Sequence, residues 1–288
     1  MGEKRKQPIY KRQRFLLEFL SQLEPSPTAT DLQKLVFLHI KAATLDYYDF
    51  IPYRYGPYSF QLSADLDTLC RDGFVDYCDP VYRVYNKNRS NILLNLPIER
   101  GDSLIRKVYN DFPYYAINSE ILPRLFKGND IDRFRKEKNS LHKSYNLLFT
   151  IGYEGKSIET FTNLLIQNDI RLLCDVRRNP LSRKFGFTST KLQHILETIG
   201  IRYIHIPEVG IASEKRIGLS TESDYDALFA EYKNNLCGIE NQLVRIWKLC
   251  EEYGRVALMC YEEDPQSCHR HIIRDYLVTN YGANCEDL

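Results

Sequence analysis

The segment from Cys260 to Arg270 brings two thiols, an imidazole, a guanidinium and several carboxylates together. It follows an apolar run at 256–259 and precedes a helical pattern at 271–277, so the predicted order is strand, polar loop, helix. In open α/β sheets, ligands bind outside the carboxyl ends of the strands, and helix N-termini there offer free amides to anions. We therefore treat this segment as a candidate active site.

Cys268 is one candidate for the chemistry, because it lies near a predicted helix N-terminus and next to His269 and Arg270. The helix dipole and nearby positive charge favour a thiolate, which suits a nucleophile or a redox-sensitive thiol. The alternative is a sulfur that only packs beneath the loop.

Glu262 is a second candidate, either as a general acid or base or as a carboxylate nucleophile at a glycosidic carbon. A metal bound by Cys260, Glu262, Cys268 and His269 is a third possibility, but this spacing is not a standard one and the sequence has no CxxC pair. Phosphate-loop and dinucleotide motifs of the GxxxxGK[ST] and GxGxxG types are absent as well. The sequence therefore predicts neither a metal nor a cofactor.

The C-terminal half alternates apolar strand patterns with helical patterns. Strands are predicted at 147–153, 171–177, 203–207 and 256–261, and helices at 157–165, 192–199, 224–234, 240–252 and 271–277. Such alternation is typical of an α/β fold with a mostly parallel sheet flanked by helices.

Parallel strands end at one edge of a sheet, so the polar residues after each predicted strand should meet there. Arginines make this edge basic and suit phosphate or another anion, which a guanidinium can bind through two hydrogen bonds. The expected substrate-binding residues are Gly152, Tyr153, Arg177, Arg178, Ser182, Arg183, Glu208, Cys260 and Arg270, and the expected catalytic residues are Asp175, Glu262, Cys268 and His269. The alternative is a buried ion-pair network that only fixes the loops.

Four ordered motifs give residues 147–282 a resemblance to the domain of unknown function 488 (DUF488) family. They are Thr150-Ile151-Gly152-Tyr153, Asp175-Val176-Arg177 with Pro180 and Ser182, Tyr203 with Pro207-Glu208, and Cys260-x-Glu262 followed by Cys268-His269-Arg270. The resemblance implies no function. The sequence departs from it at Val209-Gly210-Ile211, where Leu-Gly-Gly is usual, and at 282–288, where the final strand is reduced. One pocket wall and one sheet edge are therefore in doubt.

The N-terminal part predicts three helices, at 12–24, from about 30 to 43 and at 60–70, followed by short strands at 74–77 and 81–85. This order is that of a small winged-helix-like α+β domain. Gln33-Lys34-Leu35 and Tyr55-Gly56-Pro57-Tyr58-Ser59 also resemble a Panacea-type, SocA-like domain, which implies antitoxin or protein-interaction roles besides DNA binding. We interpret 53–59 as an aromatic loop. The candidate nucleic-acid contacts are Lys34, Arg54, Tyr55 and Tyr58.

The predicted domains are 1–97, a loosely packed connector at 98–144, and 145–288. The net charge of +1 does not require a polyanionic partner, although the first fourteen residues are basic. Neither a membrane span nor a secretion signal is indicated, and the eight cysteines lack the spacing of a disulfide framework. We therefore expect a cytoplasmic protein with free thiols, and the sequence predicts no oligomeric state.

The leading hypothesis is an enzyme, a hydrolase or transferase, that acts on nucleic acid or a nucleotide, with DNA favoured as the partner and a role in genome maintenance or defence. The rival is a non-enzymatic DNA-binding regulator that senses a ligand or redox state. An antitoxin-type interaction protein with a protein partner at its N-terminal domain is the third hypothesis.

Overall fold

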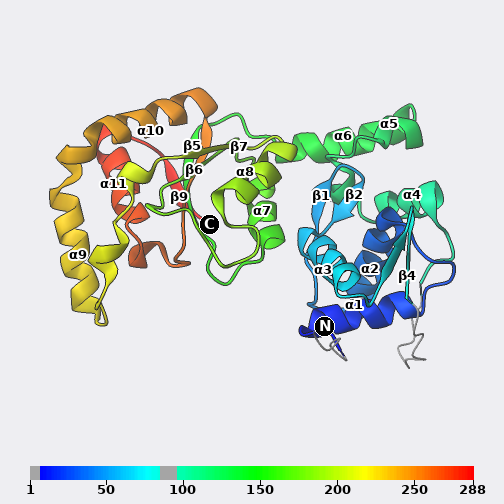
Figure 1. Cartoon of the computed structure of the whole chain (residues 1–288). Coiled ribbons are helices and arrows are strands. Elements are labelled where there is room, and N and C mark those ends of the chain that lie inside the picture. The colour runs from blue at the N-terminus through cyan, green and yellow to red at the C-terminus, as the bar shows by residue number, and fades with distance from the viewer. Residues whose placement is uncertain (1–6, 85–95) are drawn as a thin grey trace. The chain divides into compact units, whose positions relative to one another are not determined.

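The computed structural model describes residues 7–84 and 96–288. The chain divides into two compact units, Met1–Ser140 and Leu141–Leu288 (Figure 1). Residues 1–6 of the basic N-terminus and the end of the strand expected at 81–85 lie outside the described residues.

A five-stranded, all-parallel sheet forms the centre of the C-terminal unit. Its order is β7-β6-β8-β5-β9, with bounds β5 Leu147–Gly152, β6 Leu172–Asp175, β7 Arg202–His205, β8 Arg255–Cys260 and β9 Cys285–Asp287. The edge left in doubt by the sequence is completed by β9, which pairs with β5. The Thr150 hydroxyl donates to the Asp287 carboxylate at 2.6 Å and strengthens this pairing.

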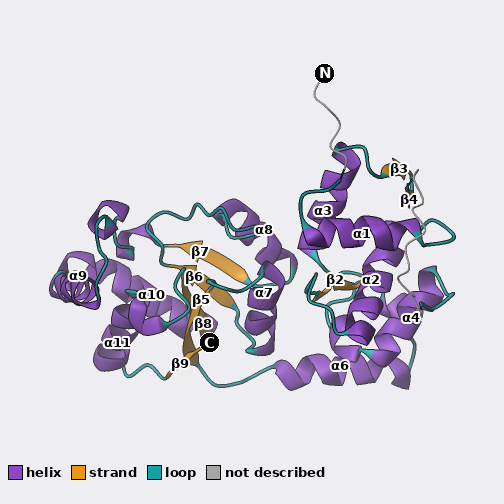
Figure 2. Cartoon of the chain, turned by 90° about the horizontal axis from the view of Figure 1, so that it is seen from below, coloured by secondary structure: helices purple, strands orange, loops and turns teal. Residues whose placement is uncertain are grey.

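Five α-helices accompany this sheet among the described residues: α7 Ile158–Gln167, α8 Ser189–Thr198, α9 Glu222–Asn234, α10 Glu240–Tyr253 and α11 Arg270–Tyr281. Helices α7 and α8 lie on one side of the sheet and α10 and α11 on the other (Figures 1 and 2). The strands are buried on both faces, because the consecutive residues Leu148 and Phe149 of β5, and Leu172 and Leu173 of β6, point to opposite faces and are all buried. The prediction of an α/β fold with a parallel sheet flanked by helices is confirmed.

The carboxyl ends of four strands share one edge of this sheet. Gly152 pairs with Cys260, and Asp175 pairs with both Met259 and His205. The segments that follow these residues therefore emerge side by side, which is the arrangement expected of a ligand-binding edge.

The N-terminal unit is mainly helical, with two short hairpins. Its elements are α1 Lys11–Ser21, α2 Ala29–Ala43, β1 Ile51–Tyr53, β2 Gly56–Tyr58, α3 Phe60–Arg71, β3 Asp76–Cys78, β4 Val81–Arg83, α4 Gly101–Asp111, η1 Pro113–Ala116, α5 Leu122–Leu125 and α6 Asn129–Leu141. Helix α2 begins two or three residues earlier than expected, because Thr28, not Thr30 or Asp31, is its N-cap and accepts a hydrogen bond from the Asp31 amide.

The aromatic segment 53–59, interpreted above as a loop, instead contains half of a hairpin. Strand β1 pairs antiparallel with β2, and Tyr53 lies opposite Gly56. Gly56 has φ +98°, and a Cβ there would lie 2.5 Å from Cε1 of Tyr109, so both the backbone conformation and the close approach favour glycine. The Gly-Pro pair therefore starts a strand here instead of only interrupting one.

Residues 98–144 do not pack loosely. Helices α4 and α6 and the segment between them bury Leu104, Val108, Tyr109 and Phe134 in the same hydrophobic cluster as the helices of the first seventy residues. The buried apolar residues of α4 recur at helical spacing, so one face of this helix packs against the core.

Lys34 is buried in this unit, although the sequence suggested a nucleic-acid contact. Its ammonium donates to the Pro57 carbonyl at 3.4 Å. Burial lowers the pKa of Lys34 to about 7, against the opposing effect of Asp31. The side chain is thus withdrawn from the surface on which nucleic acid could bind.

We expect Lys34→Met to stabilise the N-terminal unit near neutral pH. The unfolded chain keeps the Lys34 proton up to its ordinary pKa of 10.5, but the folded chain only to about 7. Between these pH values the unfolded state binds more protons than the folded state. The free energy of unfolding therefore rises with pH by up to about 1.4 kcal/mol per pH unit because of Lys34. Below pH 7 the full destabilisation caused by burying this charge is present. Hydrogen exchange of α2 amides should show this slope in the wild type and a flatter one in the variant. An unchanged slope would contradict the buried charge.

Every helix of the described residues is too short or too polar to cross a lipid bilayer.

Candidate active site at the strand ends

A small pocket of about 130 Å³ opens at the carboxyl edge of the sheet. Its lining comes from the ends of β5, β6 and β8, from the segment 211–216 and from the start of the last helix. The lining residues are Tyr153, Arg177, Arg178, Asn179, Ile211, Arg216, Cys260, Tyr261 and His269. Five of the residues expected here are therefore brought together: Tyr153, Arg177, Arg178, Cys260 and His269.

Asp175 and Arg177 form a buried ion pair behind this pocket. Nε and Nη2 of Arg177 donate to the two carboxylate oxygens of Asp175 at 2.8 and 2.6 Å. The Arg177 amide and the Tyr203 hydroxyl donate to the same carboxylate. Burial would lower the pKa of Arg177, but the hydrogen bonds and charge of Asp175 raise it overall.

This network favours the alternative interpretation for Asp175. Its side chain is fully buried and both oxygens are engaged, so it has no free lone pair directed into the pocket. Arg177 does reach the pocket, where its Nη1 donates to the Tyr153 hydroxyl at 3.1 Å. The pair therefore holds one pocket wall in place.

Cys260, Cys268 and His269 form a second buried cluster. Nε2 of His269 lies 3.1 Å from the Val176 carbonyl, and because a carbonyl only accepts, this nitrogen carries the proton. Nδ1 is then left with a lone pair, 3.7 Å from Sγ of Cys268 and 4.0 Å from Sγ of Cys260. The Cys268 thiol and burial raise the pKa of Cys260 well above its ordinary value, so Cys260 is held as a thiol.

Glu262 and Arg216 stand beside this cluster. Nη1 of Arg216 donates to Oε1 of Glu262 at 2.7 Å, and Nη2 lies 3.4 Å from Nδ1 of His269. Oε2 of Glu262 is buried and has no hydrogen-bond partner among the described residues. Burial works to raise the pKa of Glu262, but the Cys268 thiol and Arg216 lower it overall, so the carboxylate stays ionised.

Arg216 was missed by the sequence analysis. It lies in η3, Ser213–Arg216, far along the chain from Glu262 and outside the four motifs. The only local signal is that it is one of two adjacent basic residues, which is more often a feature of a solvated surface.

The family comparison bears on this part of the chain. Residues 157–277 match the family model of DUF488, a domain of unknown function. The match runs from Ser157, the N-cap of α7, into α11, and it includes Asp175, Arg177, Glu262 and Cys268. No curated protein and no solved structure matched the chain. The Panacea-type resemblance of the N-terminal part stays a prediction.

Within the DUF488 match, Arg270 is not a pocket residue. Its guanidinium is fully buried and donates to the carbonyls of Glu262 and Glu263 at 2.6 and 2.8 Å. Gly152, just before the match, serves the same loop, since a Cβ there would lie 1.8 Å from the Glu262 carbonyl oxygen. Both residues, expected to bind substrate, instead hold the 260–270 loop against β5.

The remaining expected residues of the DUF488 segment lie around the pocket without lining it. Ser182 accepts a hydrogen bond from the Lys184 amide at 3.1 Å and belongs to the loop before α8. Arg183 and Glu208 are exposed. The sequence placed them correctly after strand ends, but their loops carry them away from the pocket.

In the N-terminal unit, Arg54 and Tyr55 lie in the turn of the β1–β2 hairpin. Arg54 pairs with Glu120 at 3.3 Å, and Tyr55 is 46% exposed. Tyr58 is half-buried and packs against Tyr53. These three residues therefore share one hairpin, whereas Lys34 is buried and its ammonium donates to the Pro57 carbonyl of the same hairpin.

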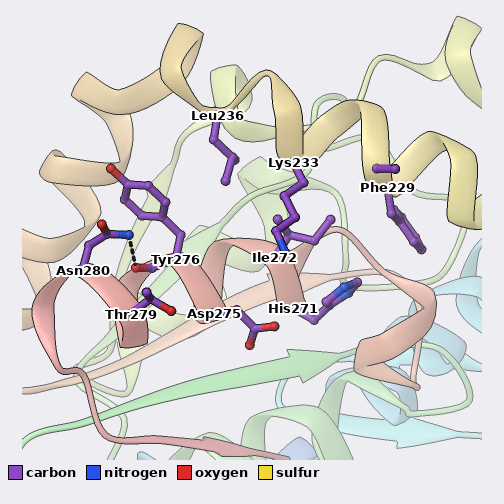
Figure 3. A pocket seen from close by; sticks show the side chains of 10 residues that line it. Phe229, Lys233, Leu236, His271, Ile272, Asp275, Tyr276, Thr279 and Asn280 are labelled. Carbon is purple, nitrogen blue, oxygen red and sulfur yellow. Dashed lines mark hydrogen bonds between the residues drawn. The ribbon is translucent and has the colours of Figure 1, made fainter.

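A larger hollow, of about 380 Å³, lies between α9 and α11 (Figure 3). Figure 3 shows Phe229 and Lys233 on α9 facing His271 and Asp275 on α11. None of the residues expected at the site lines it. It has no grouping of reactive side chains comparable to the strand-end pocket, so we place the candidate site at the strand ends.

Proposed function

We propose that the C-terminal unit is an enzyme, a hydrolase or transferase, that binds a phosphate or similar anionic group of a nucleotide or nucleic acid in the strand-end pocket. The observation that carries the proposal is the presence of three guanidinium groups, those of Arg177, Arg178 and Arg216, around a pocket of about 130 Å³. Guanidinium groups in such a confined space suit phosphate oxygens.

Arg178 and Arg216 are the cations available to an anion. The charge of Arg177 is already balanced by Asp175. Arg178 is exposed and donates to the neutral Pro207 carbonyl at 3.2 Å, and Arg216 shares its charge with one oxygen of Glu262. An incoming phosphate would therefore be held by these two side chains.

Glu262 is the group best supported for proton transfer. It is partly buried, ionised and next to the pocket-lining Arg216, and its Oε2 has no hydrogen-bond partner within the part of the chain that the structure describes. Cys268 is fully buried and does not line the pocket, and Cys260 lines it but is held as a thiol. These facts support a carboxylate acid or base over a thiolate nucleophile.

For the N-terminal unit we propose that it holds nucleic acid, DNA in preference to RNA, or a protein partner. The support is the exposed turn of the β1–β2 hairpin with Arg54 and Tyr55, and the order of α1, α2, α3 and β3–β4, which is compatible with a winged helix. A cytoplasmic protein of genome maintenance or defence is the biological setting in which such a pair of units fits.

A DNA-binding regulator or antitoxin-type protein is the alternative function. The observation in its favour is the buried Cys260, Cys268 and His269 cluster next to the pocket. Such a cluster can respond to a ligand or to oxidation without turnover.

The pocket is tested by the double variant Arg178→Ala/Arg216→Ala. We expect affinity for a fluorescent nucleoside triphosphate, measured by polarisation at low salt, to fall by at least ~10-fold, because each charge-assisted hydrogen bond is worth about 1.5–3 kcal/mol. Arg202→Ala is the matched control, since Arg202 is exposed and lies at the amino-terminal end of β7, whereas the pocket lies at the carboxyl ends of the strands.

Equal affinity in the wild type and the double variant would refute the pocket assignment, as would an equal loss in Arg202→Ala. Labelled single-stranded DNA should bind more weakly as salt rises, since phosphate contacts release counterions. DNA binding that persists in the double variant would assign DNA to another surface.

A further inference from the structure

We propose that Cys260, Cys268 and His269 form a binding site for a thiophilic divalent metal ion, for which zinc is the best chemical match. The inference goes beyond the proposed function, because it holds whichever substrate the pocket takes. From the sequence, a metal bound by Cys260, Glu262, Cys268 and His269 was only an alternative, because the two cysteines are not at a standard metal-binding spacing.

The three ligand atoms already lie close to metal-binding geometry. Sγ of Cys260, Sγ of Cys268 and Nδ1 of His269 all lie within 4.8 Å of one another. A tetrahedral zinc ion with Zn–S of about 2.3 Å and Zn–N of about 2.0–2.1 Å requires S and N to be roughly 3.6 Å apart. The observed S–N separations of 3.7 and 4.0 Å are within a few tenths of an ångström of this value. The two sulfurs, which lie within 4.8 Å of each other, must come to roughly 3.8 Å.

The imidazole is held in the tautomer that a metal needs. Nε2–H of His269 donates to the Val176 carbonyl, which leaves the Nδ1 lone pair facing the two sulfurs. A hydrogen bond from the second ring nitrogen to a carbonyl is the usual support of a metal-bound histidine. The backbone is fixed as well, because Cys260 ends β8 and Arg270 holds the intervening loop.

The surrounding charges also favour a cation. Oε2 of Glu262 is buried without a hydrogen-bond partner among the described residues, and Arg216 bridges the Glu262 carboxylate and Nδ1 of His269. On binding, each thiol gives up its proton to solvent, and the two thiolates and this carboxylate are balanced by the divalent ion together with Arg216. Nη2 of Arg216, 3.4 Å from Nδ1 of His269, must withdraw slightly while Nη1 stays on Glu262.

The donor set identifies the class of metal. Two thiolates and an imidazole select zinc over magnesium or calcium, which prefer oxygen ligands. Three protein ligands leave one position for water or for Glu262. Because Cys260 and His269 also line the strand-end pocket, the ion would lie next to any bound anion.

The test is a titration of the reduced, metal-stripped full chain with cobalt(II), followed by displacement with zinc. We expect one equivalent to bind with a thiolate-to-cobalt charge-transfer band and strong tetrahedral d–d bands. Cys260→Ser and Cys268→Ser should each weaken binding by at least ~100-fold and reduce that band, since loss of even an outer partner costs 10–100-fold. Cys237→Ser, an exposed cysteine of the same unit, should behave as the wild type.

Alkylation of the wild type followed by mass spectrometry gives a second measurement that needs no variant to fold. In urea concentrations that open the unit, zinc should protect Cys260 and Cys268 but not Cys237. The absence of a cobalt band, or binding that survives Cys268→Ser, would overturn the proposal. The proposal would also be overturned if Cys260 and Cys268 formed a disulfide and the reduced chain bound no cobalt. Failure here leaves the anion test unaffected, because that test changes only Arg178 and Arg216.

Discussion

Arg177→Ala is expected to destabilise the C-terminal unit by about 3–5 kcal/mol, because it leaves the Asp175 carboxylate charged and buried. The pair is joined by two side-chain hydrogen bonds, and both side chains are almost completely excluded from solvent. The Tyr203 hydroxyl and one backbone amide remain on Asp175 in the variant, but neither carries a charge. The loss therefore far exceeds that of a surface ion pair.

Urea unfolding followed by the fluorescence of Trp247 measures this effect, since the single tryptophan lies in α10 of the same unit. Lys215→Ala is the matched control: it breaks the pair of Lys215 with Glu231, whose side chains are about half exposed, and should cost less than about 1 kcal/mol. Arg177→Lys should not restore stability, because an ammonium cannot make the paired hydrogen bonds. A cost of Arg177→Ala as small as that of the control would show that the network does not hold the pocket wall.

The fold of the C-terminal unit could be predicted because its signals are local. Continuous apolar runs mark strands buried on both faces, and Ser157 marks the start of α7 through its side-chain hydrogen bond to the Thr160 amide. Strand β9 was underestimated because it is short and exposed, so its three residues carry no apolar pattern. Its pairing with β5 fixes it instead.

The site was harder to predict because the type of a residue does not show which partner its side chain binds in the folded protein. Arg177 and Arg270 were both expected to bind an anion. The charge of Arg177 is balanced by Asp175, and the guanidinium of Arg270 donates its hydrogen bonds to two loop carbonyls. Arg216, which does line the pocket, is brought there by tertiary structure from a segment with no motif. Lys34 illustrates the same point in the N-terminal unit, where burial outweighs its charge.

On the proposed function, Glu262→Gln should reduce turnover by roughly 10²- to 10⁴-fold, the usual contribution of a positioned acid or base. Binding of the fluorescent nucleoside triphosphate should be retained or tighten, because Arg216 loses the carboxylate that shares its charge. Release of phosphate from the nucleoside triphosphate and cleavage of labelled DNA, followed over hours, are the turnover assays.

Glu263→Gln is the matched control for this prediction, because it makes the same change of charge at the next residue, which is exposed and pairs with Lys156 at 3.2 Å. It should change neither turnover nor binding by more than about 2-fold, as expected for a surface pair worth less than about 1 kcal/mol. If Glu262→Gln weakened binding as much as turnover, Glu262 would be only a support for Arg216. Turnover equal to that of the wild type would show that Glu262 takes no part in the chemistry. Slow turnover with tighter binding would show that Glu262 transfers the proton, while the arginine cations hold the anion.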